Sequence, residues 1–336
     1  MTITRRTQFL RRQNLSDLLD NSFKMMGLTW RTSLVLSLIF FLPLSALAGW
    51  GASGFLAALA GLLPAGEAPG PTFMPGYARL LLVMMAAYLL LGLAGVFVQT
   101  AVSAHVAAAA GGRSLELPEV VRLAGRRFLL PCLLQQLVQA ALFAGLFAAL
   151  LAVAVPFLAL AVAGKAFLAA AAAGSAAAVL LGAALVIWLS LLLRFAPQAV
   201  VFDGETVFGS LQHSARLVRG SWWRLAGISI VVGIIFSFAV GLLTLPVTGA
   251  ALLPLVSRLI GHTLNGTFEP ADLAQVFRGG AWGLAVGVGG SAFIQATLEA
   301  FFLPPFFGLF YVDLKVRRGE LPERRPRRAP ARRKPG

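Results

Sequence analysis

One carboxylate lies deep inside an apolar stretch of the chain. Glu299 follows Gln295 by four residues within the otherwise uncharged run 281–312, so the two side chains share one face of a helix. Burying an ionisable group in hydrocarbon costs at least ~2.5–3.5 kcal/mol on insertion scales. Two interpretations of Glu299 are consistent with this energetic cost. Glu299 is a site for a proton, a cation or a polar substrate group, or it is a structural residue that is hydrogen-bonded or hydrated.

Other polar side chains interrupt two further apolar stretches. Gln135 and Gln139 stand four residues apart, and Gln99 and His105 lie towards the end of the run 77–110. Hydrogen bonding between helices explains such residues. A polar cavity open to the cytoplasm is the alternative. The candidate intramembrane polar site therefore consists of Glu299, Gln295, Gln135, Gln139, Gln99 and His105.

The common catalytic and cofactor motifs are missing from the sequence. The histidines His105, His213 and His262 are scattered, and neither HExxH nor paired CxxC motifs occur to hold zinc. A GxxxxGK[ST] phosphate loop is also missing. Cys132 is the single cysteine, which excludes an intrachain disulfide. We therefore expect no catalytic residue, no metal, no cofactor and no enzymatic activity.

The composition identifies the environment in which these residues must work. Of 336 residues, 58% are hydrophobic and only 12% are charged, against averages of roughly 45–50% and about 25% in globular proteins. The mean hydropathy is +0.83. These values predict an all-α polytopic membrane protein.

Six apolar stretches are long enough to cross a bilayer as helices, which takes ~20 residues each. They are 32–63, 77–110, 128–164, 166–193, 225–259 and 281–312. The third and fifth contain Pro156, Pro246 and Pro254, but two spans and a turn need more than ~40 residues. We therefore expect each to form one kinked or protruding helix, which makes six transmembrane helices.

The basic residues predict the orientation. The chain has 28 Lys and Arg against 13 Asp and Glu, and 24 of the 28 fall in the N-terminal segment, the loops 111–127 and 194–224, and the C-terminal segment. By the positive-inside rule both termini are cytoplasmic. This distribution favours anionic lipid headgroups as partners and argues against nucleic acid.

A pattern recurs before the odd-numbered spans, at spacings of 98 and 94 residues. Each copy aligns a leucine, a basic residue and an aromatic residue. The equivalent positions are Leu19, Leu117 and Leu211, then Lys24, Arg122 and Arg216, then Trp30, Phe128 and Trp222. Apolar residues at helical spacing predict three amphipathic cytoplasmic helices that lie in the interface with these residues as anchors.

The pattern gives a domain plan. Residues 1–13 form a basic N-terminal segment, and 14–316 form the six-helix membrane domain, with three parallel repeats at 14–110, 114–194 and 206–316. The alternative is that any loop-to-span junction in a basic, Leu-rich protein looks alike. Residues 317–336 are rich in proline and arginine, so we expect a disordered tail that can bind anionic lipid.

Three segments carry a family resemblance: NLSDLLDNSFKMMGLTWR, VFDGETVFGSLQHSARLVRGSWWRLAGIS and FFGLFYVDLKVRRGE. They resemble bacterial six-span proteins of the glycerophosphoryl diester phosphodiesterase membrane domain superfamily. In that family the last span leaves the membrane through a Tyr-x-Asp-Leu-Arg/Lys-x-Arg element. We call its counterpart here the exit motif: Tyr311, Asp313, Lys315 and Arg317.

The resemblance implies little about activity, because the family takes its name from relatives that also carry a soluble phosphodiesterase. Only two dozen residues follow Val312, so that activity is not carried over. Together with the predicted spans, the resemblance to bacterial proteins implies a plasma (inner) membrane protein, and we expect a non-enzymatic scaffold or accessory module in envelope or lipid processes. A transporter or lipid-translocating protein with a polar cavity among the repeats is the alternative. The substrate, the protein partner and the oligomeric state stay open.

Overall fold

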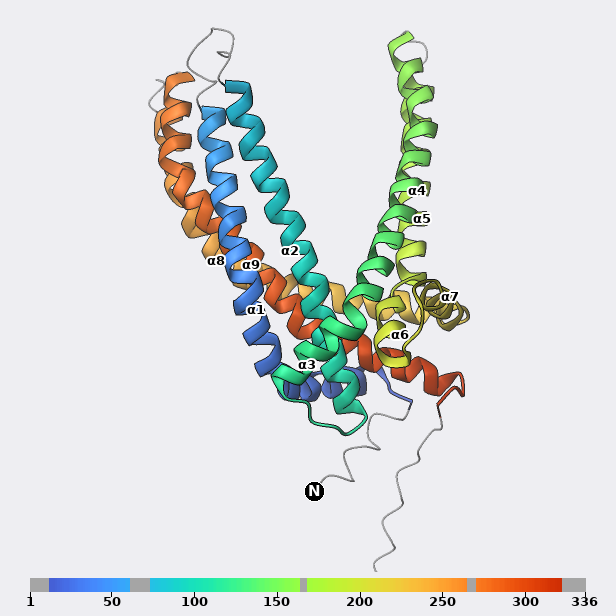
Figure 1. Ribbon diagram of the computed structural model, residues 1–336. Coiled ribbons are helices and arrows are strands. Elements are labelled where there is room, and N and C mark those ends of the chain that lie inside the picture. The colour runs from blue at the N-terminus through green and yellow to red at the C-terminus, as the bar shows by residue number, and fades with distance from the viewer. Residues whose placement is uncertain (1–11, 61–72, 164–167, 265–269, 322–336) are drawn as a thin grey trace, which may run out of the picture. The chain divides into compact units, whose positions relative to one another are not determined.

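The computed structural model describes residues 12–60, 73–163, 168–264 and 270–321, and every element in them is a helix (Figure 1). In chain order these are α1 (Leu15–Ala60), α2 (Phe73–Ala110), α3 (Leu117–Leu123), the π-helical segment η1 (Ala124–Phe128), α4 (Leu129–Ala163), α5 (Leu168–Leu192), α6 (Ala196–Asp203), α7 (Val207–Val218), α8 (Trp222–Leu264) and α9 (Pro270–Arg317).

Six of the helical segments are long and apolar enough to cross a membrane, as predicted. They contain α1, α2, α4, α5, α8 and α9. The long third and fifth apolar runs each form one helix, and α8 includes Pro246 and Pro254 without ending. The helices extend beyond most of the apolar runs because polar residues at the boundaries continue the helical hydrogen bonding.

Local signals explain where the short helices begin and end. Pro197 stands in the first turn of α6, where its missing N–H costs nothing, and Gly204 ends that helix with φ +72°. The Thr206 side chain caps α7 by accepting a hydrogen bond from the Gly209 amide at 3.2 Å. Gly220, at φ +86°, turns the chain between α7 and α8.

The chain divides into two compact units. The four-helix unit comprises Leu19–Val106 and Val231–Phe306, so it holds most of α1, α2, α8 and α9. The other described residues make up the second unit, which holds α3 to α7 together with the first residues of α1 and α8 and the last residues of α2 and α9. We call it the loop-helix unit.

Glycines bring the helices of the four-helix unit into close contact. A Cβ added at Gly49 of α1 would overlap the carbonyl oxygen of Ala285 in α9, and one added at Gly289 would lie 2.7 Å from the carbonyl oxygen of Ser45. Gly283 of α9 approaches the backbone of Ala251 in α8 equally closely. Small residues therefore set these helix contacts, as is typical of membrane proteins.

The loop-helix unit is built on the α4–α5 pair, which runs side by side in Figure 1. Gly182 of α5 faces the Leu150 side chain of α4, with 2.6 Å from an added Cβ to the nearest methyl carbon. At the end of α5, the residues Leu193, Ala196 and Leu211 form a buried apolar cluster that packs α6 and α7 together.

The three predicted junction helices differ from one another. Only α7 is a separate helix in the described residues: its apolar face is buried, and Arg219–Ser221 separate it from α8. By contrast, α1 continues without a break into its span, and α3 leads through η1 directly into α4.

The aligned side chains agree only in part. The basic residues Lys24, Arg122 and Arg216 are all exposed. The aromatics are not equivalent, because Trp30 is 44% exposed and Phe128 only 7%. The threefold repeat stays a prediction.

The predicted terminal segments fall mainly outside the described residues. These residues include only 12 and 13 of the N-terminal segment 1–13, and only 317–321 of the tail 317–336. Helix α9 ends at Arg317, and Gly319 turns the chain with φ +75°.

Replacing Gly49 by alanine should destabilise the four-helix unit. The new methyl group meets a backbone carbonyl, which cannot rotate away, so we expect a loss of about 1–3 kcal/mol from overpacking. Gly233→Ala in α8 is the matched control, because nothing lies within 4 Å of its added Cβ. Thermal unfolding in detergent measures both variants, and equal stability would remove the proposed role of Gly49.

Candidate functional site

The last two turns of α9 carry the exit motif on two opposite faces. Tyr311 and Lys315 are four residues apart and share one face, and Asp313 and Arg317 share another. Because successive residues rotate by about 100°, the two pairs point about 200° apart around the helix. The exit motif therefore contacts two different sets of partners, both within the loop-helix unit.

The first face is organised by Asp313, whose side chain is fully buried. Its carboxylate accepts a hydrogen bond from the backbone amide of Gln13 at 2.7 Å. It also accepts from Arg224 Nη1 at 2.6 Å and from Arg317 Nε at 3.0 Å. A buried carboxylate with three donors, two of them cationic, is well compensated for the loss of water.

The two arginines also share a second acceptor. Arg224 Nη2 and Arg317 Nη2 donate to the backbone carbonyl of Gln13, at 2.7 and 2.9 Å. Gln13, Arg224, Asp313 and Arg317 therefore form a closed network that joins the segment before α1, the start of α8 and the end of α9. We call it the Asp313 network.

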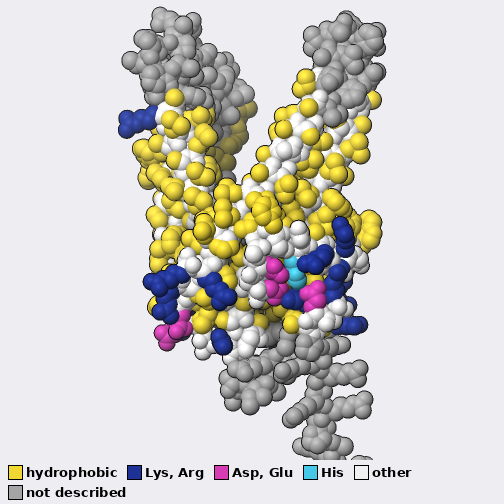
Figure 2. All heavy atoms as spheres, turned by 45° about the vertical axis from the view of Figure 1, so that its right-hand side comes forward, with side chains coloured by type: hydrophobic (Ala, Val, Ile, Leu, Met, Phe, Trp, Pro, Cys, Tyr) yellow, Lys and Arg dark blue, Asp and Glu magenta, His cyan; other side chains and the backbone are white. Residues whose placement is uncertain are grey.

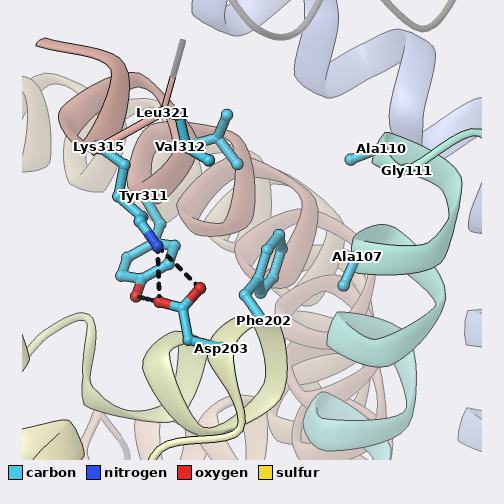
Figure 3. A pocket seen from close by; sticks show the side chains of 9 residues that line it. All are labelled: Ala107, Ala110, Gly111, Phe202, Asp203, Tyr311, Val312, Lys315 and Leu321. Atoms are coloured by element: carbon cyan, nitrogen blue, oxygen red, sulfur yellow. Dashed lines mark hydrogen bonds and ion pairs between the residues drawn. The ribbon is translucent and has the colours of Figure 1, made fainter. Parts of the chain in front are cut away.

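The second face is organised by Asp203, the last residue of α6 (Figure 3). The Tyr311 hydroxyl donates to one carboxylate oxygen. Lys315 Nζ donates to both oxygens, at 2.8 and 2.9 Å, and lies 5.6 Å from the centre of the Tyr311 ring. A carboxylate and an aromatic ring thus surround one ammonium group.

Further titratable groups adjoin this face. His213 Nε2 lies 3.8 Å from an Asp203 oxygen and 3.7 Å from a Glu320 oxygen, and its Nδ1 lies 3.9 Å from Glu205. The Nε2 atom is buried and makes no hydrogen bond to any of the described residues. The Tyr311 and His213 rings are 6.0 Å apart. Three carboxylates therefore gather around one lysine and one imidazole.

A pocket of about 210 Å³ opens beside Asp203 (Figure 3). Its polar wall is the hydrogen-bonded set Asp203, Tyr311 and Lys315. The other residues that line it are Ala107, Ala110, Gly111, Phe202, Val312 and Leu321. The pocket combines charge on one wall with a small apolar and aromatic surface on the others.

An exposed basic and aromatic surface lies on α7 and at the start of α8. Phe208 is 66% and Trp223 is 83% exposed, and Arg216 and Arg219 are exposed beside them in sequence. We call these four residues the α7 surface. Figure 2 shows Lys and Arg side chains gathered around acidic side chains and a histidine, whereas hydrophobic side chains cover the long helices.

The predicted pair of Glu299 and Gln295 is present in α9. Gln295 Nε2 donates to Glu299 Oε1 at 3.0 Å. Gln295 is exposed and Glu299 is half-buried. The pair therefore lies on an outward face of α9 and does not point into the interior of the four-helix unit. Both residues belong to the four-helix unit.

The other predicted polar residues make contacts both within one helix and between helices. Gln135 is fully buried and donates to Gln139 Oε1 at 2.8 Å, while its own amide oxygen has no hydrogen-bond partner in the part of the chain that the structure describes. His105 Nδ1 lies 3.0 Å from the buried Thr32 hydroxyl, and Gln99 is half-buried. The two glutamines of α4 lie in the loop-helix unit and the rest lie in the four-helix unit, so the candidates divide between the two units.

The sequence analysis missed the partners of the exit motif, above all Asp203 and Arg224. Acidic residues are scarce in this chain, and Asp203 and Glu205 stand in a segment where basic residues prevail. That scarcity was a usable signal. The sequence contains no such signal for Gln13, because this residue takes part in the network through its backbone amide and carbonyl.

Metal chemistry finds no support in the described residues. No three His, Cys, Asp or Glu side chains are arranged there so that they could hold a metal ion. What the site offers instead is ion pairing and hydrogen bonding at the pocket wall.

Removing the Asp313 carboxylate should destabilise the fold. Asp313→Ala leaves the Gln13 amide without its acceptor and leaves Arg224 and Arg317, which are 28% and 31% exposed, with the Gln13 carbonyl as their remaining acceptor among the described residues. Because water can reach both arginines, we expect a loss of about 1–3 kcal/mol, less than the ~3–5 kcal/mol of a fully buried broken pair. Asp20→Ala is the control, because that carboxylate is exposed on α1. Thermal unfolding and membrane abundance measure the effect; wild-type stability in Asp313→Ala would show that the network is dispensable.

Comparison with known proteins adds a family but no activity. A family model described as "Domain of unknown function (DUF7847)" matches residues 104–312, which is more than half of the chain. The match reaches from the end of α2 into the exit motif and includes Asp203, Tyr311 and the pocket residues up to Val312. No match was found among curated proteins or solved structures. The chain therefore belongs to the DUF7847 family of domains of unknown function.

Proposed function

We propose that this chain is a non-enzymatic accessory protein of the bacterial inner membrane that binds anionic lipid headgroups at its cytoplasmic face. The observation that carries the proposal is the α7 surface. Its exposed aromatics and arginines stand on the short helix α7, just after its end and in the first turn of the membrane-crossing helix α8. Such a place in the chain puts them at the level of the headgroups.

The division of α7 into faces supports this role. Leu211, Leu217 and Val218 are buried. The protein therefore uses one face of α7 for packing, and the opposite face is free for lipid. Aromatic rings favour the membrane–water boundary, and each basic residue near an anionic surface contributes ~1 kcal/mol to binding.

The distribution of charge extends the proposal to topology and repeats. With 24 of 28 basic residues assigned to one side, both termini are cytoplasmic. The exposed Lys24 and Arg122 occupy positions equivalent to Arg216 in the proposed repeats. The three junctions would then present basic residues to the same leaflet.

The relationship to the glycerophosphoryl diester phosphodiesterase membrane domain superfamily is part of the proposal. It is supported by the exit motif, whose four side chains all make structural contacts in the loop-helix unit. A membrane domain of that kind without its soluble enzyme fits an accessory role in envelope or lipid processes.

Lipid binding can be tested at the α7 surface. We expect Arg216→Glu with Arg219→Glu to lower the binding of phosphatidylglycerol by at least about tenfold, because two attractions of ~1 kcal/mol each become repulsions. Arg79→Glu with Arg258→Glu is the matched control: both are exposed and both are assigned to the other side. Native mass spectrometry of the purified protein gives the measurement. Unchanged lipid binding in the α7 variant would contradict the proposal.

Transport is the second candidate, and one observation favours it. The buried amide oxygen of Gln135 has no hydrogen-bond partner among the described residues, so it is an acceptor that a polar substrate would reach when the side chains packed over it move aside. An accessory role predicts that Gln135→Leu complements a deletion strain as well as the half-buried control Gln136→Leu does. Loss of complementation by Gln135→Leu at normal abundance would favour transport instead.

A further inference from the structure

We propose that the pocket beside Asp203 binds an organic ammonium group. This site goes beyond the proposed lipid surface on α7 and does not rest on it. The ligand class follows from the walls of the pocket, from the charge around it and from an ammonium group that the protein already places there.

Lys315 demonstrates which chemistry the pocket accepts. Its Nζ donates hydrogen bonds to both carboxylate oxygens of Asp203, at 2.8 and 2.9 Å. The same atom lies 5.6 Å from the centre of the Tyr311 ring. A carboxylate combined with an aromatic ring is the usual protein environment for ammonium ligands. Lys315 therefore acts as an internal ammonium that a ligand of the same chemistry can replace.

The charge around the pocket favours a cation over an anion. Asp203, Glu205 and Glu320 contribute three carboxylates. Lys315 is the lysine among them, and the imidazole of His213 completes the group. Even when the Arg127 guanidinium beside Gly204 is counted with Lys315, three carboxylates face two permanent cations, so a further ammonium gains electrostatic energy at this place and a phosphate loses it.

The backbone adds to this preference. The pocket is lined by the last turn of α2, the last residues of α6 and the last two turns of α9. Each of these is a helix C-terminus, which carries the negative end of the helix dipole. Three negative helix ends thus meet at the pocket.

The remaining walls fit the carbon atoms of a small amine. Phe202 and Tyr311 are 5.7 Å apart at a steep angle, and Ala107, Ala110 and Val312 complete an apolar surface. A volume of about 210 Å³ has room for a two-carbon amine such as ethanolamine. Both the free molecule and an aminophospholipid headgroup present this chemistry.

Exchange needs only a rotation of the Lys315 side chain. Glu320 lies 4.0 Å from Lys315 Nζ and offers a second carboxylate to the displaced ammonium. The ligand ammonium then takes the place of Nζ between Asp203 and the Tyr311 ring. Hydrogen bonds are exchanged in this step, and no covalent bond is made or broken.

Titration of the purified full chain with ethanolamine, followed by calorimetry, tests the site. We expect Lys315→Gln to bind at least several-fold more tightly than the wild type, because the competing internal ammonium is gone. Asp203→Asn should lose binding, and Ala107→Leu should lose it by filling the pocket without changing any charge. A gain in affinity cannot come from unfolding, so Lys315→Gln keeps the test decisive even where Asp203→Asn fails to fold.

The controls separate the source of the ligand from the site itself. Arg318→Gln removes an exposed cation three residues away and should leave ethanolamine affinity unchanged. If nanodiscs of phosphatidylethanolamine compete with ethanolamine and nanodiscs of phosphatidylglycerol do not, the ligand is the lipid headgroup; without competition it is the free amine. Folded Lys315→Gln that binds no more ethanolamine than the wild type, or Ala107→Leu that binds it equally well, would overturn the proposal whatever the α7 surface does.

Discussion

A buried carboxylate must find its charge partners inside the protein, and Asp313 meets this constraint by drawing together segments that are 300 residues apart in the chain. Its donors come from the segment before α1, from the first turn of α8 and from its own helix. Each arginine also binds the Gln13 carbonyl, so no member can move alone. The starts of α1 and α8 and the end of α9 are therefore fixed together within the loop-helix unit.

Helix geometry links this network to the pocket. Asp313 and Lys315 are two residues apart, so a rigid turn of α9 that holds one against the arginines aims the other at Asp203. The face of α9 that carries Asp313 and the face that carries Lys315 therefore belong to the same turns, which are held by the same backbone hydrogen bonds. A site built on a helix that is fixed on its opposite side is already organised for its ligand, which lowers the entropic cost of binding.

The apolar spans follow a different rule. Their predicted polar side chains pair within one helix, as Gln135 with Gln139 and Gln295 with Glu299, or with the neighbouring helix, as His105 with Thr32. Their close contacts are made by glycines against backbone, as at Gly49 and Ala285. Polar chemistry is concentrated where the helices end, and this is why the α7 surface and the pocket carry the functional proposals.

The sequence alone determined the helical class and the number of helices apolar enough to cross a membrane, because hydropathy and helical spacing are local properties of the chain. It also predicted that Gln295 and Glu299 pair, since four residues make one turn. It did not determine that Glu299 lies along the helix surface, because hydropathy gives the depth of a residue and not the direction in which it faces. Nor did it show that Tyr311 and Lys315 meet Asp203, more than a hundred residues earlier, or that Asp313 meets the backbone of Gln13. Those partners are chosen by how the loop-helix unit folds in three dimensions, and a backbone amide leaves no mark in the sequence.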